Sequence, residues 1–330
     1  MKKTLLRLFY LASVVVLVVA CNKDKIDQDT ATPQALEKPI SVVNGRLVFS
    51  SKESFEATIG TLKKQQNQLR KWESQFDGFT SMNTAYENLT ESDFEKMAAA
   101  NTTDGYENII TFVGVGEQRE AVINIEDPLM ASLVNKDGLL QIGEDVYKIN
   151  YDQVVKVKVS DINKLEGARL SNKNASLEVL PVTHTVLSEA SSPNGRIAEE
   201  RVCTQEYRTS GGIGGIKKRL VGEIYATTIG VLYSGVGART KHQQRIGGVW
   251  FRKRTNQIRL TVTGQFVYYG VGSRTENVNY DSGIQTDDGR DAYTFRFCFN
   301  ASCEFKINYA NSTHYALCDD GRARQCNLSW

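Results

Sequence analysis

The chain has 330 residues, of which 41% are hydrophobic and 24% are charged, so it can bury a sizeable core and is not a low-complexity chain. Its formal charge of +2 hides two parts of opposite sign. Residues 22–200 carry 19 Lys/Arg and 28 Asp/Glu, whereas residues 201–330 carry 18 Lys/Arg and 10 Asp/Glu. This change of sign predicts a domain boundary near residue 200.

The first twenty residues have the pattern of a secretory signal peptide. A basic start precedes an apolar run over residues 8–19, which is too short to cross a bilayer because a helical span needs about 20 apolar residues. Ala20 followed by Cys21 resembles the bacterial lipobox, in which the signal is cleaved before the cysteine and the cysteine is acylated. We therefore predict a signal peptide over residues 1–20, lipid attachment at Cys21 and a membrane as the first partner. The alternative is an ordinary signal peptide with a cysteine at its cleavage site by chance.

Residues 21–45 are expected to form a flexible tether, because they are rich in Lys, Asp, Thr and Gln and contain two prolines. The charged start of this tether resembles the export tag of Bacteroidota surface lipoproteins, which implies display on the outer face of the outer membrane; a periplasmic-facing position is the alternative. Residues 29–31 (DTA) resemble the O-glycosylation motif of Bacteroidota secreted proteins. Thr30 would be the acceptor, and an unmodified linker is the alternative.

Residues 46–185 are expected to form an α+β domain. A strand over residues 46–49 is followed by a capping box of Ser50 and Glu53 and by apolar residues at helical spacing, which predicts a helix facing the core. From residue 106 onward, short β-branched runs alternate with Gly, Asn and Asp. This pattern predicts a small antiparallel sheet.

Two segments of this domain, residues 127–135 (DPLMASLVN) and 138–149 (GLLQIGEDVYKI), carry a family resemblance. They resemble a motif that recurs in uncharacterised Bacteroidota cell-envelope lipoproteins. Together with residues 46–76, the resemblance covers roughly half of the mature chain. It implies an envelope location and this domain layout, and it implies no activity, cofactor or catalytic residue.

Residues 186–200 have the composition of a linker, and residues 201–330 are expected to form an all-β domain of the sandwich type. Short β-branched and aromatic runs alternate there with Gly, Asn and Asp turns. One segment is repeated, at residues 233–240 (YSGVGART) and 268–275 (YYGVGSRT). The repeat predicts either a pair of anion-binding loops or two equivalent strands that each contain a glycine bulge.

Positive charge is concentrated in residues 217–259, which hold ten Lys/Arg and a single acidic residue, Glu223. Such a density predicts a face that attracts anions, and export favours an anionic glycan or another envelope protein over nucleic acid, which is not expected. The predicted anion-binding residues come from this segment and from the repeat, and are Arg239, Lys241, Arg245, Arg252, Lys253, Arg254 and Arg274. The alternatives are a solvated sheet face and an internal role, in which the acidic first domain docks against the basic second one.

All five cysteines of the second domain are candidates for disulfides, because export places them in an oxidising compartment. The predicted pairs are Cys298 with Cys303 and Cys318 with Cys326, which leave Cys203 free. No metal site is predicted, since the spacings lack a paired CxxC.

Catalytic motifs are absent from the sequence: there is no nucleophile elbow, HExxH motif or P-loop, and the three histidines stand in no recognisable relation to a nucleophile. No catalytic residue and no cofactor are predicted. We interpret the chain as a non-catalytic binding module of the bacterial envelope. A structural or scaffold subunit of an envelope complex is the alternative, and a glycan-processing hydrolase is the weaker one.

We expect Cys21→Ala to release the protein from the membrane without unfolding it, because the lipid is carried by the tether and not by a folded domain. Fractionation of cell envelopes, followed by a thermal melt of the released protein, measures both properties. A variant that stays in the membrane fraction, or that is released unfolded, would contradict the prediction.

Overall fold

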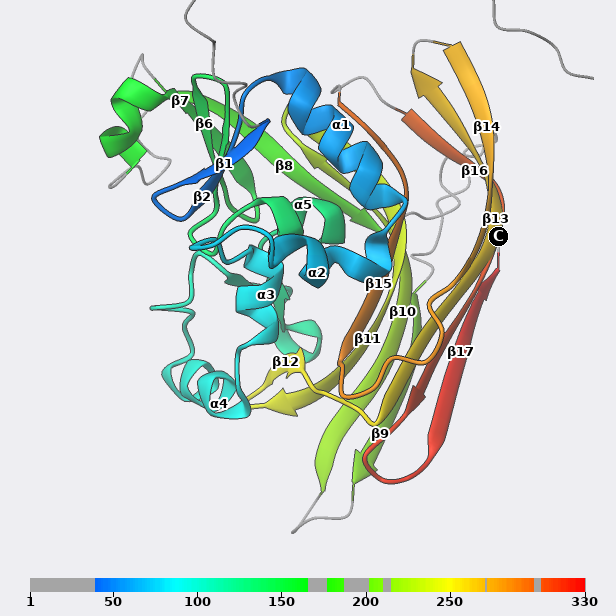
Figure 1. The fold of residues 1–330 in the computed structure, drawn as a ribbon. Helices are drawn as coiled ribbons and strands as arrows, with labels where there is room; N and C mark the ends of the chain where they lie inside the picture. The colour runs from blue at the N-terminus through cyan, green and yellow to red at the C-terminus, as the bar shows by residue number, and fades with distance from the viewer. Residues whose placement is uncertain are drawn as a thin grey trace, which may run out of the picture. The chain divides into compact units, whose positions relative to one another are not determined.

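The computed structural model describes residues 39–165, 177–186, 202–209, 215–270, 272–299 and 304–329. All of these described residues belong to one compact unit (Figure 1). The predicted signal peptide, Cys21, Thr30 and most of the tether lie outside the described residues, as do residues 187–200 of the predicted linker. Within the described ranges, no helix has the length and apolar character needed to cross a membrane.

Strands dominate the fold, with 52% of the described residues against 21% in helices. The predicted fold class, an α+β domain followed by a separate all-β sandwich, is therefore wrong. One large curled sheet takes strands from both predicted domains, because β8 (Glu178–Val186) pairs antiparallel with β10 (Ile216–Ile229) across the predicted linker. This pairing gives β8 the hydrogen-bond partners that an edge strand of an isolated first domain would lack.

The large sheet contains thirteen strands, and most neighbours are antiparallel. Its main path runs in the order β1 (Ile40–Val43), β2 (Arg46–Phe49), β5 (Leu139–Ile142), β6 (Asp145–Ile149), β7 (Gln153–Lys158), β8, β10, β11 (Tyr233–Ile246), β12 (Val249–Arg252), β4 (Glu120–Ile123) and β3 (Ile110–Val113). Off this path, β9 (Val202–Thr209) pairs with β10, and β15 (Arg290–Cys298) pairs with β11. The predicted strand at residues 46–49 is confirmed as β2, whereas residues 40–43, predicted as tether, form β1 beside it.

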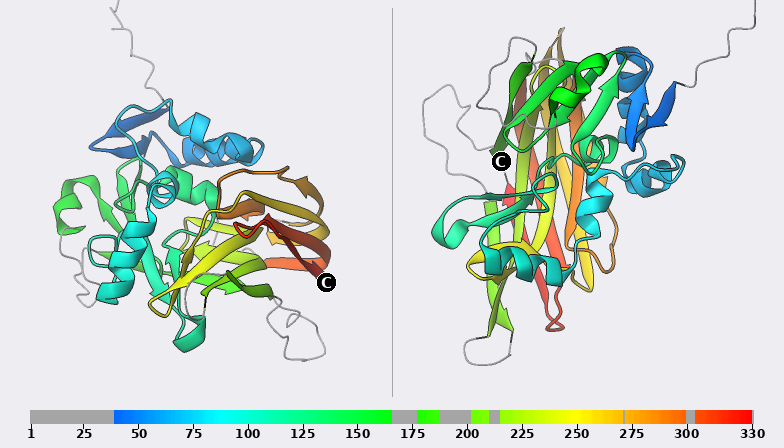
Figure 2. Two further views of the ribbon diagram at one scale, coloured as in Figure 1. Left: turned by 90° about the horizontal axis from the view of Figure 1, so that it is seen from below. Right: turned by 90° about the vertical axis from the view of Figure 1, so that its left-hand side faces the viewer.

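The second sheet contains four strands, in the order β14 (Gly272–Asp281), β13 (Gln257–Gly270), β16 (Glu304–Leu317) and β17 (Ala323–Ser329). It packs against one face of the large sheet, and the helices cover the other face (Figure 2). The helices are α1 (Lys52–Lys63), α2 (Leu69–Glu73), α3 (Met82–Glu87), α4 (Glu91–Ala100) and α5 (Pro128–Leu133), with 3-10 turns at Gln66–Gln68, Gly116–Gln118 and Val159–Leu165.

β11 contributes to a core on each side of the large sheet. Tyr233 packs with the helices, whereas Val236 and Ala238 pack between the two sheets with Phe266 and Phe295. Because successive side chains of a strand point to opposite faces, β11 is buried on both sides over most of its length, although its second half is rich in polar and charged residues. The helical layer and the second sheet therefore depend on the same central strands.

The predicted first helix begins one residue later than expected and is interrupted. Ser51, not Ser50, caps α1 through its hydroxyl, which accepts from the Ser54 amide. Between α1 and α2 the chain makes a 3-10 turn, where the Gln66 side chain pairs with the backbone of Thr294 in β15, donating to its carbonyl at 2.8 Å and accepting from its amide at 2.9 Å. A side-chain amide thus satisfies part of the free edge of β15, and a continuous helix would not place it there.

The two sheets are joined by a disulfide between Cys203 of β9 and Cys326 of β17, with a Cα separation of 5.8 Å. The predicted pair of Cys318 and Cys326 is therefore wrong, and Cys318 is a buried free thiol. Nearness in sequence misled the prediction, because the packing of the two sheets places β17 next to β9 from far along the chain. Cys298 is disulfide-bonded, and its predicted partner Cys303 lies outside the described residues.

The two copies of the repeated segment have different structures. The first copy lies inside β11, and its pairing with β15 shifts register between Val236 and Gly237, as a glycine bulge requires. The second copy joins β13 to β14, where Gly270 pairs with Gly272. The interpretation as two equivalent strands is therefore wrong, although the bulge in the first copy is confirmed.

Two histidines, His242 and His314, are fully buried in this β-rich core. The His314 ring lies between the hydroxyls of Thr240 and Ser312, each at 2.9 Å from a ring nitrogen. Burial lowers the pKa of both imidazoles to about 4, because the charged form would lose its hydration.

We expect these two residues to lower the free energy of unfolding as the pH falls from 6.5 to 4. Unfolded imidazoles take up protons near pH 6.5 and the folded ones only near pH 4, so the unfolded state binds more protons in this window. In urea titrations, His314→Gln should show a shallower decline than the wild type as the pH is lowered. Equal slopes in the two proteins would contradict the prediction.

Candidate functional site

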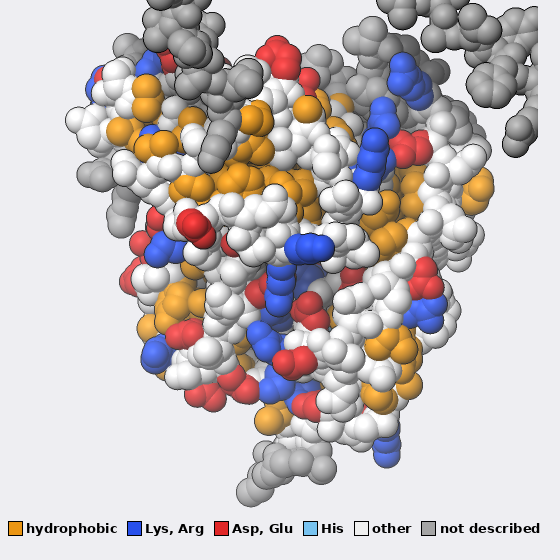
Figure 3. All heavy atoms as spheres, in the orientation of Figure 1, with side chains coloured by type: hydrophobic (Ala, Val, Ile, Leu, Met, Phe, Trp, Pro, Cys, Tyr) orange, Lys and Arg blue, Asp and Glu red, His pale blue; other side chains and the backbone are white. Residues whose placement is uncertain are grey.

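A pocket of about 420 Å³ opens between α2, α3, the chain after β12 and the loop that joins β14 to β15. Four arginines, four acidic residues and two tyrosines contribute to its wall. On the face seen in Figure 3, basic and acidic side chains gather side by side over this region. The volume suits a small molecule or a few sugar units rather than a single ion.

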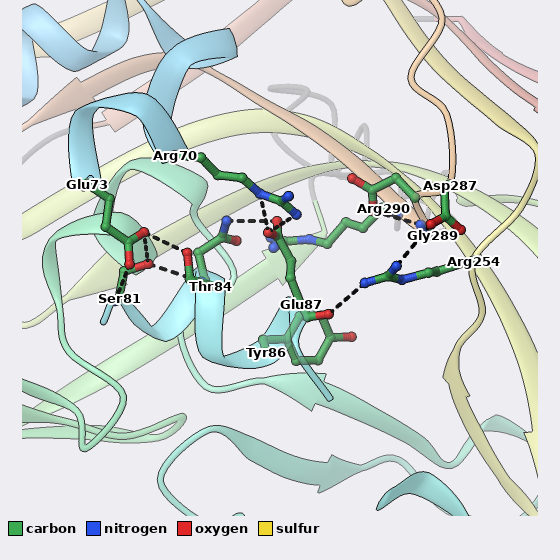
Figure 4. A network of polar contacts seen from close by, with 12 residues as sticks. Arg70, Glu73, Ser81, Thr84, Tyr86, Glu87, Arg254, Asp287, Gly289 and Arg290 are labelled. Atoms are coloured by element: carbon green, nitrogen blue, oxygen red, sulfur yellow. Dashed lines mark hydrogen bonds and ion pairs between the residues drawn. The ribbon is translucent and has the colours of Figure 1, made fainter. Parts of the chain in front are cut away.

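The wall formed by α3 is fixed at its N-terminal end by Glu73 of α2. This buried carboxylate accepts from the Ser81 amide at 2.8 Å, from the Ser81 hydroxyl at 2.7 Å and from the Thr84 hydroxyl at 2.6 Å (Figure 4). Ser81 also caps α3 by accepting from the Thr84 amide. These contacts place Tyr86 and Glu87, in the last turn of α3, at the pocket.

Arg252 of β12 holds the other end of α3. Its Nη2 donates to the carbonyl oxygens of Tyr86 and Glu87, each at 3.0 Å, and its guanidinium lies 4.9 Å from the centre of the Tyr86 ring. Carbonyls at a helix C-terminus lack partners within the helix, and a cation satisfies them well. Arg252 is only 7% exposed, and its buried Nε has no hydrogen-bond partner within the described ranges.

Two further arginines are anchored to backbone carbonyls at the pocket. Arg254 donates to the Glu87 carbonyl and to the Asp287 carboxylate, each at 3.1 Å (Figure 4). Arg290 donates to the Glu126 carbonyl. In the part of the chain that the structure describes, neither Arg252 nor Arg290 forms an ion pair with a carboxylate. Their hydrogen bonds orient the guanidinium groups without pairing them directly with a carboxylate.

A fourth arginine, Arg70 of α2, pairs with Glu87 across the pocket, with Nε 2.7 Å from Oε2. Its side chain is mostly exposed. Exposed ion pairs of this kind contribute little to stability, about 0–1 kcal/mol. The Arg70–Glu87 pair can therefore open when a ligand offers better partners.

Asp291 of β15 is a buried carboxyl group in the pocket wall, 8% exposed, and its Oδ2 has no hydrogen-bond partner. Burial raises its pKa to about 7, the Ser282 hydroxyl opposes this shift, and the negative charge of Asp288 adds to it. A carboxyl group with this pKa is present in both protonation states near neutral pH. Burial also raises the pKa of Tyr280, a second polar group of the wall.

The structure places Arg239 and Lys241, two of the predicted anion-binding residues, in a buried ion-pair network. Arg239 contacts Glu126 at 2.8 Å and also pairs with Glu223, and Lys241 contacts Glu120 at 3.2 Å and Glu223 at 2.9 Å. Burial alone would raise the pKa of Glu223, but the charges of Arg239 and Lys241 outweigh it and hold this pKa below its usual value. These two cations face the acidic first half of the chain.

The remaining predicted anion-binding residues separate into four places. Arg245 pairs with Glu117, and Lys253 pairs with Glu91 at 2.9 Å. Arg274 is exposed on β14 and is not part of the pocket wall, whereas Arg252 and Arg254 are part of it. Most of the predicted anion-binding side chains therefore pair with acidic residues of the first half, as expected from the internal alternative, in which the acidic first half docks against the basic second half.

Sequence reasoning missed Arg70, Tyr86, Arg290 and Asp291, which complete the pocket. They come from α2, α3 and β15 and share no motif or regular spacing. Only the packing of the helices against the edge of the large sheet brings them together. For the described residues, no group of three or more His, Cys, Asp and Glu side chains has the arrangement of a metal site.

No protein-family model matches the chain, and no curated protein matches it in sequence. Among solved structures, the chain is similar to a DUF4848 family protein from Bacteroides thetaiotaomicron, with a TM-score of 0.27 and 11% sequence identity. The match covers 88% of this chain and 100% of that chain. A TM-score this low supports no conclusion about fold or function.

We expect Asp291→Asn to raise the free energy of unfolding at pH 8. The unfolded carboxyl loses its proton near pH 3.8 and the folded one near pH 7, so the wild type loses stability as the pH rises between these values. The loss is on the order of 1.4 kcal/mol for each pH unit, and the amide avoids it. Urea unfolding of the wild type and the variant at pH 4 and pH 8 measures the difference. If the variant's gain in the free energy of unfolding over the wild type is no larger at pH 8 than at pH 4, Asp291 is not held in its neutral form.

Proposed function

We propose that the protein is a non-catalytic binding module of the bacterial envelope and that it holds an anionic glycan in this pocket. The proposal rests on the hydrogen-bond partners of Arg252 and Arg290. Both guanidinium groups border the pocket, are oriented by backbone carbonyls and, within the described ranges, have no carboxylate partner. Charged donors that are held in place before the ligand arrives favour an anion.

The rest of the wall supports a glycan over a simple inorganic anion. Asn67, Gln285 and Asp288 supply donors and acceptors, and a sugar hydroxyl can use both kinds of partner. The ring of Tyr280, stacked on Tyr293 with centroids 3.7 Å apart, adds a flat apolar surface of the kind that holds the apolar face of a sugar ring. A phosphate or sulfate ion would use only a small part of the 420 Å³.

The envelope location is the second part of the proposal, and it rests on the sequence. The basic start, the short apolar run and Ala20 before Cys21 support a lipid-anchored outer-membrane protein with surface display. Thr30 in the tether is the proposed O-glycosylation site. A tether of this composition lets the pocket reach ligands beyond the membrane surface.

A glycan-processing hydrolase is the second candidate, favoured by the raised pKa of Asp291 beside the carboxyl group of Asp288. Glycosidases use two carboxyl groups whose proton affinities differ. Incubation with a panel of acidic polysaccharides, followed by detection of reducing ends, decides between the two functions. Turnover that Asp291→Asn abolishes would identify an enzyme.

We expect Arg290→Gln to weaken the binding of acidic oligosaccharides about tenfold or more, because a hydrogen bond to a charged group contributes about 1.5–3 kcal/mol. Calorimetry of the full chain with a panel of oligogalacturonides and neutral malto-oligosaccharides measures the effect. Arg252 is unsuited to this test, since its loss would also uncap α3.

Arg274→Gln is the matched control for this experiment, because it removes the same charge from an exposed position outside the pocket wall. It should leave the affinity unchanged, and thermal melts should show that both variants are folded. An equal loss in both variants would indicate diffuse attraction to the surface and contradict the pocket, and a panel without a single binder would contradict the anionic glycan.

A further inference from the structure

A second, smaller cavity of about 20 Å³ adjoins the pocket. Its wall includes Tyr86, Arg252 and Arg290, which also line the pocket, together with Glu126 and Lys241. These three shared residues mark the boundary between the two spaces. The small cavity has room for about one or two water-sized groups.

Positive charge converges on this boundary at the hydroxyl of Tyr86. Burial raises the pKa of Tyr86, the charges of Arg252, Arg290 and Lys241 each act to lower it, and the charge of Glu120 acts to raise it. Three cations and one carboxylate therefore influence this hydroxyl, so the cations outnumber the carboxylates around it. Lys241 is already paired with Glu120 and Glu223, so Arg252 and Arg290 supply the charge that is not neutralised locally.

The same boundary holds a buried donor without a partner. Among the residues that the structure describes, none forms a hydrogen bond with Nε of Arg252, although Arg252 is only 7% exposed. Buried donors are nearly always paired in native proteins, so an unpaired one calls for a water or a ligand atom. A guanidinium edge suits the planar oxygens of a carboxylate especially well.

We infer that Arg252, Arg290 and the Tyr86 hydroxyl form a carboxylate subsite at this boundary, which binds the acid group of a uronic-acid residue of the glycan. The inference rests on the proposed function and deepens it, because it names the chemical group by which the glycan is recognised. A flat carboxylate can place one oxygen in the small cavity while its sugar ring stays in the pocket. A sulfate ester, with three terminal oxygens, is bulkier than this space.

The first test is the binding of trigalacturonic acid by the full chain and by Tyr86→Phe. This substitution removes the hydroxyl and keeps the ring that contacts Arg252, so the fold should be retained. We expect about a tenfold to hundredfold loss of affinity, the range for a hydrogen bond to a charged group. Tyr309→Phe, at an exposed position outside the pocket wall, is the matched control and should bind as the wild type does.

The second test uses two probes that separate the subsite from the glycan. The methyl ester of trigalacturonic acid should bind the wild type as weakly as the free acid binds Tyr86→Phe. Crystals of the full chain soaked in sodium bromide should show bromide within hydrogen-bond distance of the Arg252 Nε and the Tyr86 hydroxyl.

The outcomes distinguish the two proposals. Acid binding that is insensitive to esterification and to Tyr86→Phe, with only water at the boundary, would overturn the carboxylate subsite and leave the glycan-binding function standing. Bromide at the boundary without any oligosaccharide binding would support an anion subsite and overturn the proposed function. If no bromide binds at the boundary and no oligosaccharide binds, the carboxylate subsite and the proposed function are both overturned.

Discussion

The fold depends on the buried ion pairs of Arg239 with Glu126 and Glu223. Glu126 belongs to the acidic first half of the chain, at the start of the segment that forms α5, and Glu223 and Arg239 lie on the central strands β10 and β11. A buried charge is tolerated only when it is paired, and removal of one partner from such a group costs about 3–5 kcal/mol. The helical layer is thereby fixed to the large sheet at one place, and the charge asymmetry of the sequence becomes an internal contact.

The pocket is a consequence of the same contact. One wall comes from α2 and α3 in the first half, and the other comes from β12, β15 and the loop before β15 in the second half. Arg252 and Arg254 reach across to the last carbonyls of α3, and Arg290 reaches the carbonyl of Glu126. Cations that contact backbone carbonyls hold two layers together while keeping their charge, so one set of arginines serves both packing and the proposed recognition of an anion.

The sequence allowed several local features to be predicted, and it misled where long-range pairing decides. The strand at residues 46–49 and the bulge in the first repeated segment follow from side-chain pattern and glycine placement. The disulfide pairing and the shared sheet do not, because Cys203 meets Cys326 only through the packing of the two sheets and β8 meets β10 only through strand order. Of the predicted anion-binding residues, Arg252 and Arg254 border the pocket, whereas Arg239 and Lys241 neutralise carboxylates that the sequence places far away.

By itself, the sequence determined the strand-rich second half and the concentration of basic residues, and it predicts the export signals, since these features depend on neighbouring residues and on composition. Tertiary structure alone decided which cations are neutralised and which remain available. Whether an arginine faces a carboxylate or a carbonyl depends on residues more than a hundred positions away, as for Arg252 and α3. The composition gives the number of cations, but the packing of the helices on the curled sheet determines which partner each cation has.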